Sequence, residues 1–201
     1  MSTKDRILSE ALILFAEKGY SAVFVNDIAD AVGIKAPSLY KHYKGKQDIF
    51  DSCVQKFYER MTEVKSDLQL PDSPSSELSY ETATTEMIVS FAEGLFKFYL
   101  RDEVAAGFRK MLMIERFQNP ELNRIYEDLF IHGAVAHEEG IFKELIKKGV
   151  LKNEDPHILA LRFYTPIYYL LQKYDAHPDK DEEALEELRS IVKEFCETYS
   201  N

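Results

Sequence analysis

The sequence predicts an all-α protein. Apolar residues recur at three- and four-residue steps along most of the chain, and no segment of useful length alternates apolar with polar residues. Glycine and proline stand where helices end or begin, and 45% of the 201 residues are hydrophobic, which is ample for a packed core. Together these observations predict about nine helices in two domains, an N-terminal domain of residues 1–47 and a C-terminal domain of residues 48–201.

Three helices are expected in the N-terminal domain. The first starts at Thr3, which can cap it, and stops at Gly19, which can adopt the left-handed conformation. The second covers residues 26–32 and stops at Gly33. The third covers residues 37–43, because its proline suits the first turn, where a missing N–H is no loss.

Six further helices are expected in the C-terminal domain. Asn119 and Pro120 form a cap and a first turn, and Gly133 is the place for a bend in the long helix that follows them. Residues 68–79 contain two prolines and several serines and are expected to form a loop. The expected helices span residues 47–66, 80–100, 104–117, 120–148, 156–174 and 180–199.

Charge is distributed unevenly along the chain. The net charge is −10, which argues against a protein that coats nucleic acid or an anionic membrane with its whole surface. Residues 1–50, however, hold seven Lys or Arg against six Asp or Glu, while the other residues hold 18 against 29. The N-terminal quarter is therefore free to meet a polyanion.

The stretch AVGIKAPSLYKHYKGKQDIF, residues 31–50, has the features of a helix-turn-helix motif. Ala29 is small where the second helix must cross, Gly33 permits the turn, Ile34 plugs the core and Leu39 locks the recognition helix. A solvated basic turn between ordinary core helices is the alternative interpretation of the same residues.

In the helix-turn-helix interpretation, the exposed side chains of the third helix meet DNA. Ser38 and the ring of Pro37 can reach base edges, Tyr40 and His42 can donate to phosphates, and Lys41 can do either. Lys46 lies just before the next helix, whose N-terminal amides favour an anion. The predicted DNA-contacting residues are Asn26, Lys35, Pro37, Ser38, Tyr40, Lys41, His42 and Lys46.

Residues 6–50 resemble the TetR family of bacterial transcription regulators. The resemblance rests on the sequence segments LFAEKGY, DIADAVGI and SLYKHY at fixed spacing. One departure concerns the start of the second helix, where the family usually has Thr or Ser as a cap and phosphate contact. This chain has Phe24 and Val25 there, followed by Asn26 at a position where family members often place a DNA-contacting side chain.

The C-terminal domain resembles the regulatory domain of one common branch of the family, through residues 108–130 and 145–171. The resemblance implies an apolar pocket for an inducer, and Phe and Met can line such a cavity adaptably. Plain core packing is the alternative for each of these side chains. The predicted pocket is lined by parts of Phe57, Met61, Phe91, Phe108, Met111 and Tyr164.

The helix expected at residues 156–174 is apolar nearly all round, so it must be covered on more than one side. A second copy of the chain is the simplest cover. The family resemblance implies the same, since the last two helices of its members form a four-helix dimer interface. A homodimer in turn predicts a palindromic double-stranded DNA operator.

Other classes of function find little support in the sequence. Cys53 and Cys196 are expected to be buried apolar residues, and His132 and His137 point about 140° apart on a helix, so no metal site is expected. No catalytic constellation, cofactor motif, signal peptide or membrane span is apparent, so we expect a cytoplasmic protein that is not an enzyme.

The sequence thus predicts a homodimeric, ligand-responsive DNA-binding transcriptional regulator. The expected mode is repression, with release from the operator by a small apolar or amphipathic effector. The alternative is an all-helical metabolite-binding protein or enzyme that retains only the helix-turn-helix shape.

Overall fold

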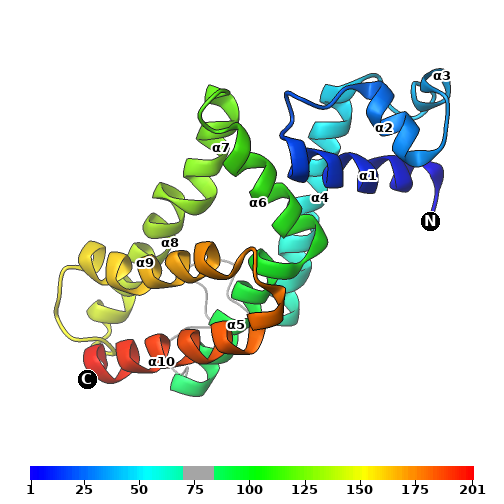
Figure 1. Ribbon diagram of the computed structural model, residues 1–201. Helices are drawn as coiled ribbons and strands as arrows, with labels where there is room; N and C mark the ends of the chain where they lie inside the picture. The colour runs from blue at the N-terminus through cyan, green and yellow to red at the C-terminus, as the bar shows by residue number, and fades with distance from the viewer. Residues whose placement is uncertain (70–83) are drawn as a thin grey trace. The chain divides into compact units, whose positions relative to one another are not determined.

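The computed structural model describes residues 1–69 and 84–201, and both parts are helical (Figure 1). Most of the loop expected at residues 68–79, and the first residues of the helix expected at 80–100, lie outside the described residues. Within them the chain forms ten α-helices and one short 3-10 helix, η2 (Pro178–Lys180). The α-helices are α1 (Thr3–Lys18), α2 (Val25–Val32), α3 (Ala36–Leu39), α4 (Lys46–Asp67), α5 (Thr85–Arg101), α6 (Glu103–Glu115), α7 (Pro120–Phe130), α8 (His132–Lys147), α9 (Pro156–Tyr174) and α10 (Asp181–Tyr199).

Side-chain caps define several of these helix ends. Ser2, and not Thr3, caps α1, because the Ser2 Oγ accepts from the Asp5 amide at 3.2 Å while the Asp5 carboxylate accepts from the Ser2 amide at 3.0 Å. Asp155 caps α9 by accepting from the amides of His157 and Ile158. With this cap, α9 has the bounds that the sequence predicts.

The helix expected at residues 120–148 is two helices in the structure. Ile131 lies between α7 and α8 with φ −122° and ψ −86°, which is not helical. Gly133 makes this break possible, since a Cβ built on it would lie 1.8 Å from the Asp128 carbonyl oxygen. The chain therefore breaks sharply here instead of bending, and this break accounts for ten α-helices where nine were expected.

The third helix is shorter than the sequence predicts. It ends at Leu39, and turns hydrogen-bonded from Lys41 to Ser38 and from His42 to Leu39 continue to Tyr43. Each of these two bonds joins residues three apart in sequence, as in a 3-10 turn, which tightens the end of a helix instead of extending it.

The chain divides into two compact units. The first comprises Met1–Glu63 and Arg101–Tyr126, and the second comprises Val64–Leu100 and Glu127–Asn201. In the first unit, α1 packs along α6, where Gly107 lets the two helices approach: a Cβ there would lie 3.2 Å from Leu12. A series of neighbouring aromatic rings fills its interior, namely Phe15, Tyr20, Phe50, Phe108 and Phe57.

The second unit has two apolar clusters. One joins α5, α9 and α10, with Phe96, Leu171 and Leu188 buried in it. The other joins α8, α9 and the end of α10, where the ring of Phe142 lies 5.4 Å from that of Phe195. An antiparallel bridge between Leu151 and Ser200 ties the end of the chain to the α8–α9 loop.

Candidate nucleic-acid interface

The helix-turn-helix motif is formed by α2, the turn at Gly33 and α3. The Ile34 amide donates to the Ala29 carbonyl at 2.9 Å, which closes the turn, and Leu39 is fully buried beneath α3. A guanidinium nitrogen of Arg6, on α1, donates to the Val32 carbonyl at 2.6 Å and so holds the end of α2. The motif is thus anchored to α1 as well as internally bonded.

Most of the predicted DNA-contacting side chains are on the surface of this motif. Six are exposed and two, Ser38 and Lys46, are half-buried. The exposed set carries two lysines, a histidine and a tyrosine that is 56% exposed. Its members are Asn26, Lys35, Pro37, Tyr40, Lys41 and His42. Exposure of polar and cationic groups around a short helix is what contact with base edges and phosphates requires.

Lys46 has a second role that its place in the sequence does not reveal. Its Nζ donates to the Tyr20 carbonyl at 2.8 Å and lies 4.3 Å from the centre of the Tyr20 ring. Burial lowers the pKa of Lys46, and the Glu115 carboxylate partly opposes that shift. The ammonium therefore ties α4 to the α1–α2 turn, and its phosphate contact stays a prediction.

The start of α2 confirms the departure noted in the sequence. Phe24 makes no side-chain cap and is 68% exposed. The Asp27 carboxylate instead accepts from the Phe24 amide at 2.7 Å. The helix end is thereby satisfied without the usual hydroxyl.

Glu115 is a positioning residue that sequence reasoning missed. It lies on α6, is 4% exposed, and accepts from the Ser21 amide at 2.6 Å and from the Ser21 hydroxyl at 2.7 Å. Gly19 permits this approach: its φ is +83°, and a Cβ on it would lie 2.6 Å from a Glu115 carboxylate oxygen. The last turn of α6 thus holds the α1–α2 turn, which leads into the helix-turn-helix.

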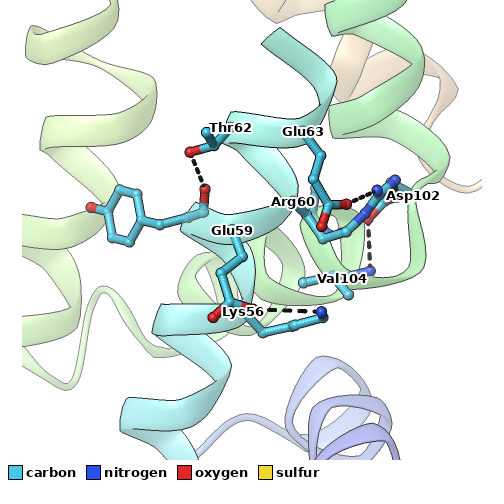
Figure 2. A network of polar contacts seen from close by, with 9 residues as sticks. Lys56, Glu59, Arg60, Thr62, Glu63, Asp102 and Val104 are labelled. Atoms are coloured by element: carbon cyan, nitrogen blue, oxygen red, sulfur yellow. Dashed lines mark hydrogen bonds and ion pairs between the residues drawn. The ribbon is translucent and has the colours of Figure 1, made fainter. Parts of the chain in front are cut away.

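The other end of α6 is held by α4 (Figure 2). Arg60 of α4 donates to one carboxylate oxygen of Asp102 at 2.9 Å, and also binds Glu63 on its own helix. The other Asp102 oxygen caps α6 by accepting from the amides of Val104 and Ala105. Within the first unit, therefore, α6 is bonded to α4 at its start and to the α1–α2 turn at its end.

The residues predicted to line an effector pocket fall into both compact units. Phe57, Met61, Phe108 and Met111 belong to the first, where the rings of Phe57 and Phe108 stack at 4.9 Å. Phe91 and Tyr164 belong to the second, where the Tyr164 hydroxyl donates to the Phe130 carbonyl at 2.8 Å. Their shared role in one pocket stays a prediction.

Metal ligands and membrane spans are two further features that could define a function. In the part of the chain that the structure describes, no three His, Cys, Asp or Glu side chains group as metal ligands. None of the described helices is long and apolar enough to cross a bilayer.

An exposed helix-turn-helix followed by further helices, as in the described residues, is typical of helical DNA-binding regulators. Residues 7–53 match the family of bacterial regulatory proteins described as the tetR family. The match covers the N-terminal region of the chain and agrees with the sequence resemblance to the TetR family there.

Similar proteins fall into two groups. In sequence, 55 residues are 42% identical to IcaR of Staphylococcus epidermidis, a negative transcriptional regulator of the biofilm operon icaADBC; the match covers 27% of this chain and 30% of IcaR. The match thus spans less than a third of that relative. In structure, the chain resembles SmeT bound to triclosan, with a TM-score of 0.70 at 17% identity over 100% of this chain and 93% of SmeT.

A second structural neighbour is a protein from Saccharomonospora viridis, described as a transcriptional regulator and bound to choline. Its TM-score is 0.69 at 19% identity, over 98% of this chain and 97% of that chain. At these identities the two structures establish a shared fold, and their ligands are their own.

Proposed function

We propose that this chain is a homodimeric transcriptional regulator that binds a palindromic operator and represses transcription until a small effector releases it. Residues 1–47 read the operator, and residues 48–201 bind the effector and dimerise. The observation that carries the proposal is the exposed helix-turn-helix, with Leu39 buried beneath α3 and Lys41 and His42 directed outward from the turns after it. Acting on DNA places the protein in the cytoplasm.

The names of similar proteins support repression as the mode of action. IcaR is a negative regulator, and SmeT is the repressor of the Stenotrophomonas maltophilia multidrug efflux pump SmeDEF. Two of the structural neighbours are complexes with small molecules, triclosan and choline. An effector that binds the C-terminal domain of this chain is consistent with both.

The dimer is supported by the surface of α9. Ile158, Leu161 and Tyr169 are 40%, 37% and 60% exposed, although their helix also contributes to both apolar clusters of the second unit. Apolar side chains repeated along one exposed helix face are the usual sign of a covering partner. A second copy of the chain satisfies this face and gives the two-fold symmetry that a palindromic operator needs.

The symmetry also sets the spacing of the two DNA-binding domains, residues 1–47 of each copy. To enter successive major grooves on one side of B-DNA they must be about 34–36 Å apart. An effector can release the operator when it binds more tightly to a conformation of the dimer in which this spacing is different. By reciprocity, operator must then weaken effector binding by the same factor.

The test is a genomic pull-down of DNA bound by the purified protein, followed by titration of the enriched fragment over a range of salt. The proposal expects a palindromic sequence, steep salt dependence and a dimeric sedimentation coefficient. Ser38→Ala and Lys41→Ala should alter base preference by roughly 1–3 kcal/mol for each base contact that the substitution removes. Equal affinity for all fragments, or a monomer of 23.3 kDa at micromolar concentration, would contradict the proposal.

A further inference from the structure

Phe24 is an aromatic side chain on the surface of the helix-turn-helix motif. It is the residue just before α2, its backbone is extended, and its side chain is 68% exposed. The apolar residues near it in the sequence behave differently, since Val23 and Ile28 are fully buried. Most of the Phe24 ring is thus left outside the core that its neighbours form.

Two of the predicted DNA-contacting residues lie close to Phe24. Asn26 follows it by two residues and is exposed, and the Lys46 ammonium lies 5.9 Å from the centre of the Phe24 ring. The same ammonium donates to the Tyr20 carbonyl, so the turn that leads to Phe24 holds it in place. The ring accordingly lies within the surface that the proposed function assigns to DNA.

The first turn of α2 has little to offer a phosphate. A helix N-terminus usually attracts anions through its free amides and the positive end of its dipole. Here the Asp27 carboxylate accepts from the Phe24 amide at 2.7 Å, so a negative charge already occupies this end of the helix. The Phe24 side chain adds no hydroxyl, amide or charge. The apolar parts of DNA are therefore better partners for this end of α2 than a phosphate oxygen is.

Duplex DNA presents two kinds of apolar group to a protein, the deoxyribose rings of the backbone and the thymine methyl groups in the major groove. In helix-turn-helix proteins the second helix enters the major groove, whereas the first helix crosses the backbone. Phe24 stands just before the first of these helices, α2, which packs against the proposed recognition helix α3 (Figure 1). A sugar is therefore the nearer partner for its ring.

We propose that Phe24 packs its ring against a deoxyribose of the operator and so makes an uncharged contact that orients the motif on the duplex. The inference rests on the proposed DNA-binding function and adds one contact to it. Removing the ring from water contributes affinity in proportion to the apolar area that is covered, and it releases no counterions. Because every nucleotide of DNA carries the same sugar, the contact selects no base.

The experiment measures DNA affinity against salt concentration for the full-length wild type, Phe24→Ala and Phe24→Ser. Each protein is titrated with the operator fragment from the genomic pull-down and with an unrelated duplex of the same length. We expect Phe24→Ala to weaken binding to both duplexes about tenfold at every salt concentration, with an unchanged slope of log K against log salt. Loss of a phosphate contact would instead reduce the magnitude of that slope.

Two further variants separate the ring from the fold. Serine is a favourable N-cap, so Phe24→Ser should keep or raise the free energy of unfolding, and its loss of affinity then reflects the missing ring and not a weaker α2. Phe117→Ala is the matched control, because Phe117 is 85% exposed in the same compact unit but lies after α6 and outside the predicted DNA contacts. It should bind both duplexes as the wild type does.

Three results would overturn the inference: unchanged affinity in folded Phe24→Ala, a reduced salt slope in that variant, or a loss of affinity confined to the operator. A fourth is a loss that disappears when uracil replaces thymine in the operator, since the ring then contacts a thymine methyl and not a sugar. Failure of the wild type to bind any duplex would contradict the proposed function and the contact with it. Wild-type binding that Phe24→Ala leaves intact would contradict the contact alone.

Discussion

The two compact units both use polar side chains to join segments distant in sequence. In the first unit Glu115 binds Ser21 and Arg60 binds Asp102, so both ends of α6 are held. In the second unit Arg189 binds Glu93 in the same way, but the half-buried Glu138 makes no hydrogen bond or ion pair with the described residues. Satisfied polar contacts between distant segments favour one geometry. The difference between the units therefore lies in single residues and not in the way their segments are joined.

The surfaces of the two units differ more clearly. Around α3 the exposed groups are polar or cationic, such as Lys41 and His42. Along α9 they include Leu161 and Tyr169, which are apolar or largely so. The first surface underlies the proposed contact with DNA, and the second underlies the proposed dimer.

The largest expected effect separates the core of the second unit from its exposed face. Leu188 is fully buried among α5, α9 and α10, so Leu188→Glu should lower the free energy of unfolding by about 4 kcal/mol or more. Tyr169→Glu, on the exposed face, should leave the fold intact and dissociate the proposed dimer. Urea denaturation and sedimentation of both variants distinguish the two results. A Tyr169→Glu protein that remains as firmly dimeric as the wild type would remove this face from the interface.

The second effect concerns the bond between α6 and the α1–α2 turn. Glu115→Ala leaves the Ser21 amide without its acceptor and should cost about 1–3 kcal/mol of stability, with weaker operator binding in the folded fraction. Glu103→Ala is the control, because Glu103 lies exposed on the same helix and should change stability by less than about 0.5 kcal/mol. If both variants bind operator as the wild type does, Glu115 serves the fold alone.

A third effect is a pH dependence that belongs to the second unit. Because burial raises the pKa of Glu138 to about 7, the folded state holds this proton to higher pH than the unfolded state does. The stability linked to that proton is present below the ordinary glutamate pKa and is lost as the pH rises through about 7. Its nearby titrating neighbour is His137, whose pKa is lowered by burial and then by Lys65. Denaturation of wild type and Glu138→Gln between about pH 5 and pH 8 should show a smaller decline in the variant; parallel declines would contradict it.

Much of the helical fold was predictable, because its signals are local. Asp155 and Pro156 mark the start of α9, and the apolar pattern marks its length, so its bounds agree with the prediction. Gly133 marked the place for a bend, but the complete break at Ile131 was not predictable from helical periodicity, which continues through it. The break depends on the approach of Gly133 to the Asp128 carbonyl, a backbone contact that leaves no pattern in the sequence.

The candidate interface was predictable to a similar extent. The sequence motifs identify the exposed side chains of α3. The hydrogen bond between Glu115 and Ser21, in contrast, joins residues 94 apart and has no local signal in the sequence. The direction of the Lys46 side chain depends on Tyr20, and a lysine before a helix is equally consistent with a phosphate contact. Glu138 did leave a signal, a charged residue in an apolar stripe, but its lack of a partner among the described residues depends on the fold.

The smallest expected effect distinguishes the lysines that lie around the helix-turn-helix. Lys41 is exposed, so Lys41→Ala should reduce the slope of log K against log salt by about one for each phosphate contact that it removes, or about two for a dimer. Lys44→Ala, a residue absent from the predicted contacts but exposed in the same turn, tests whether it belongs with them. Lys46 already donates to the Tyr20 and Ser21 carbonyls and has one N–H left for a phosphate. Lys46→Ala should therefore change the slope less than Lys41→Ala does and lower the free energy of unfolding, because the tie between α4 and the α1–α2 turn is broken. A full reduction of the slope in Lys46→Ala with unchanged stability would show instead that this ammonium leaves the turn and binds DNA.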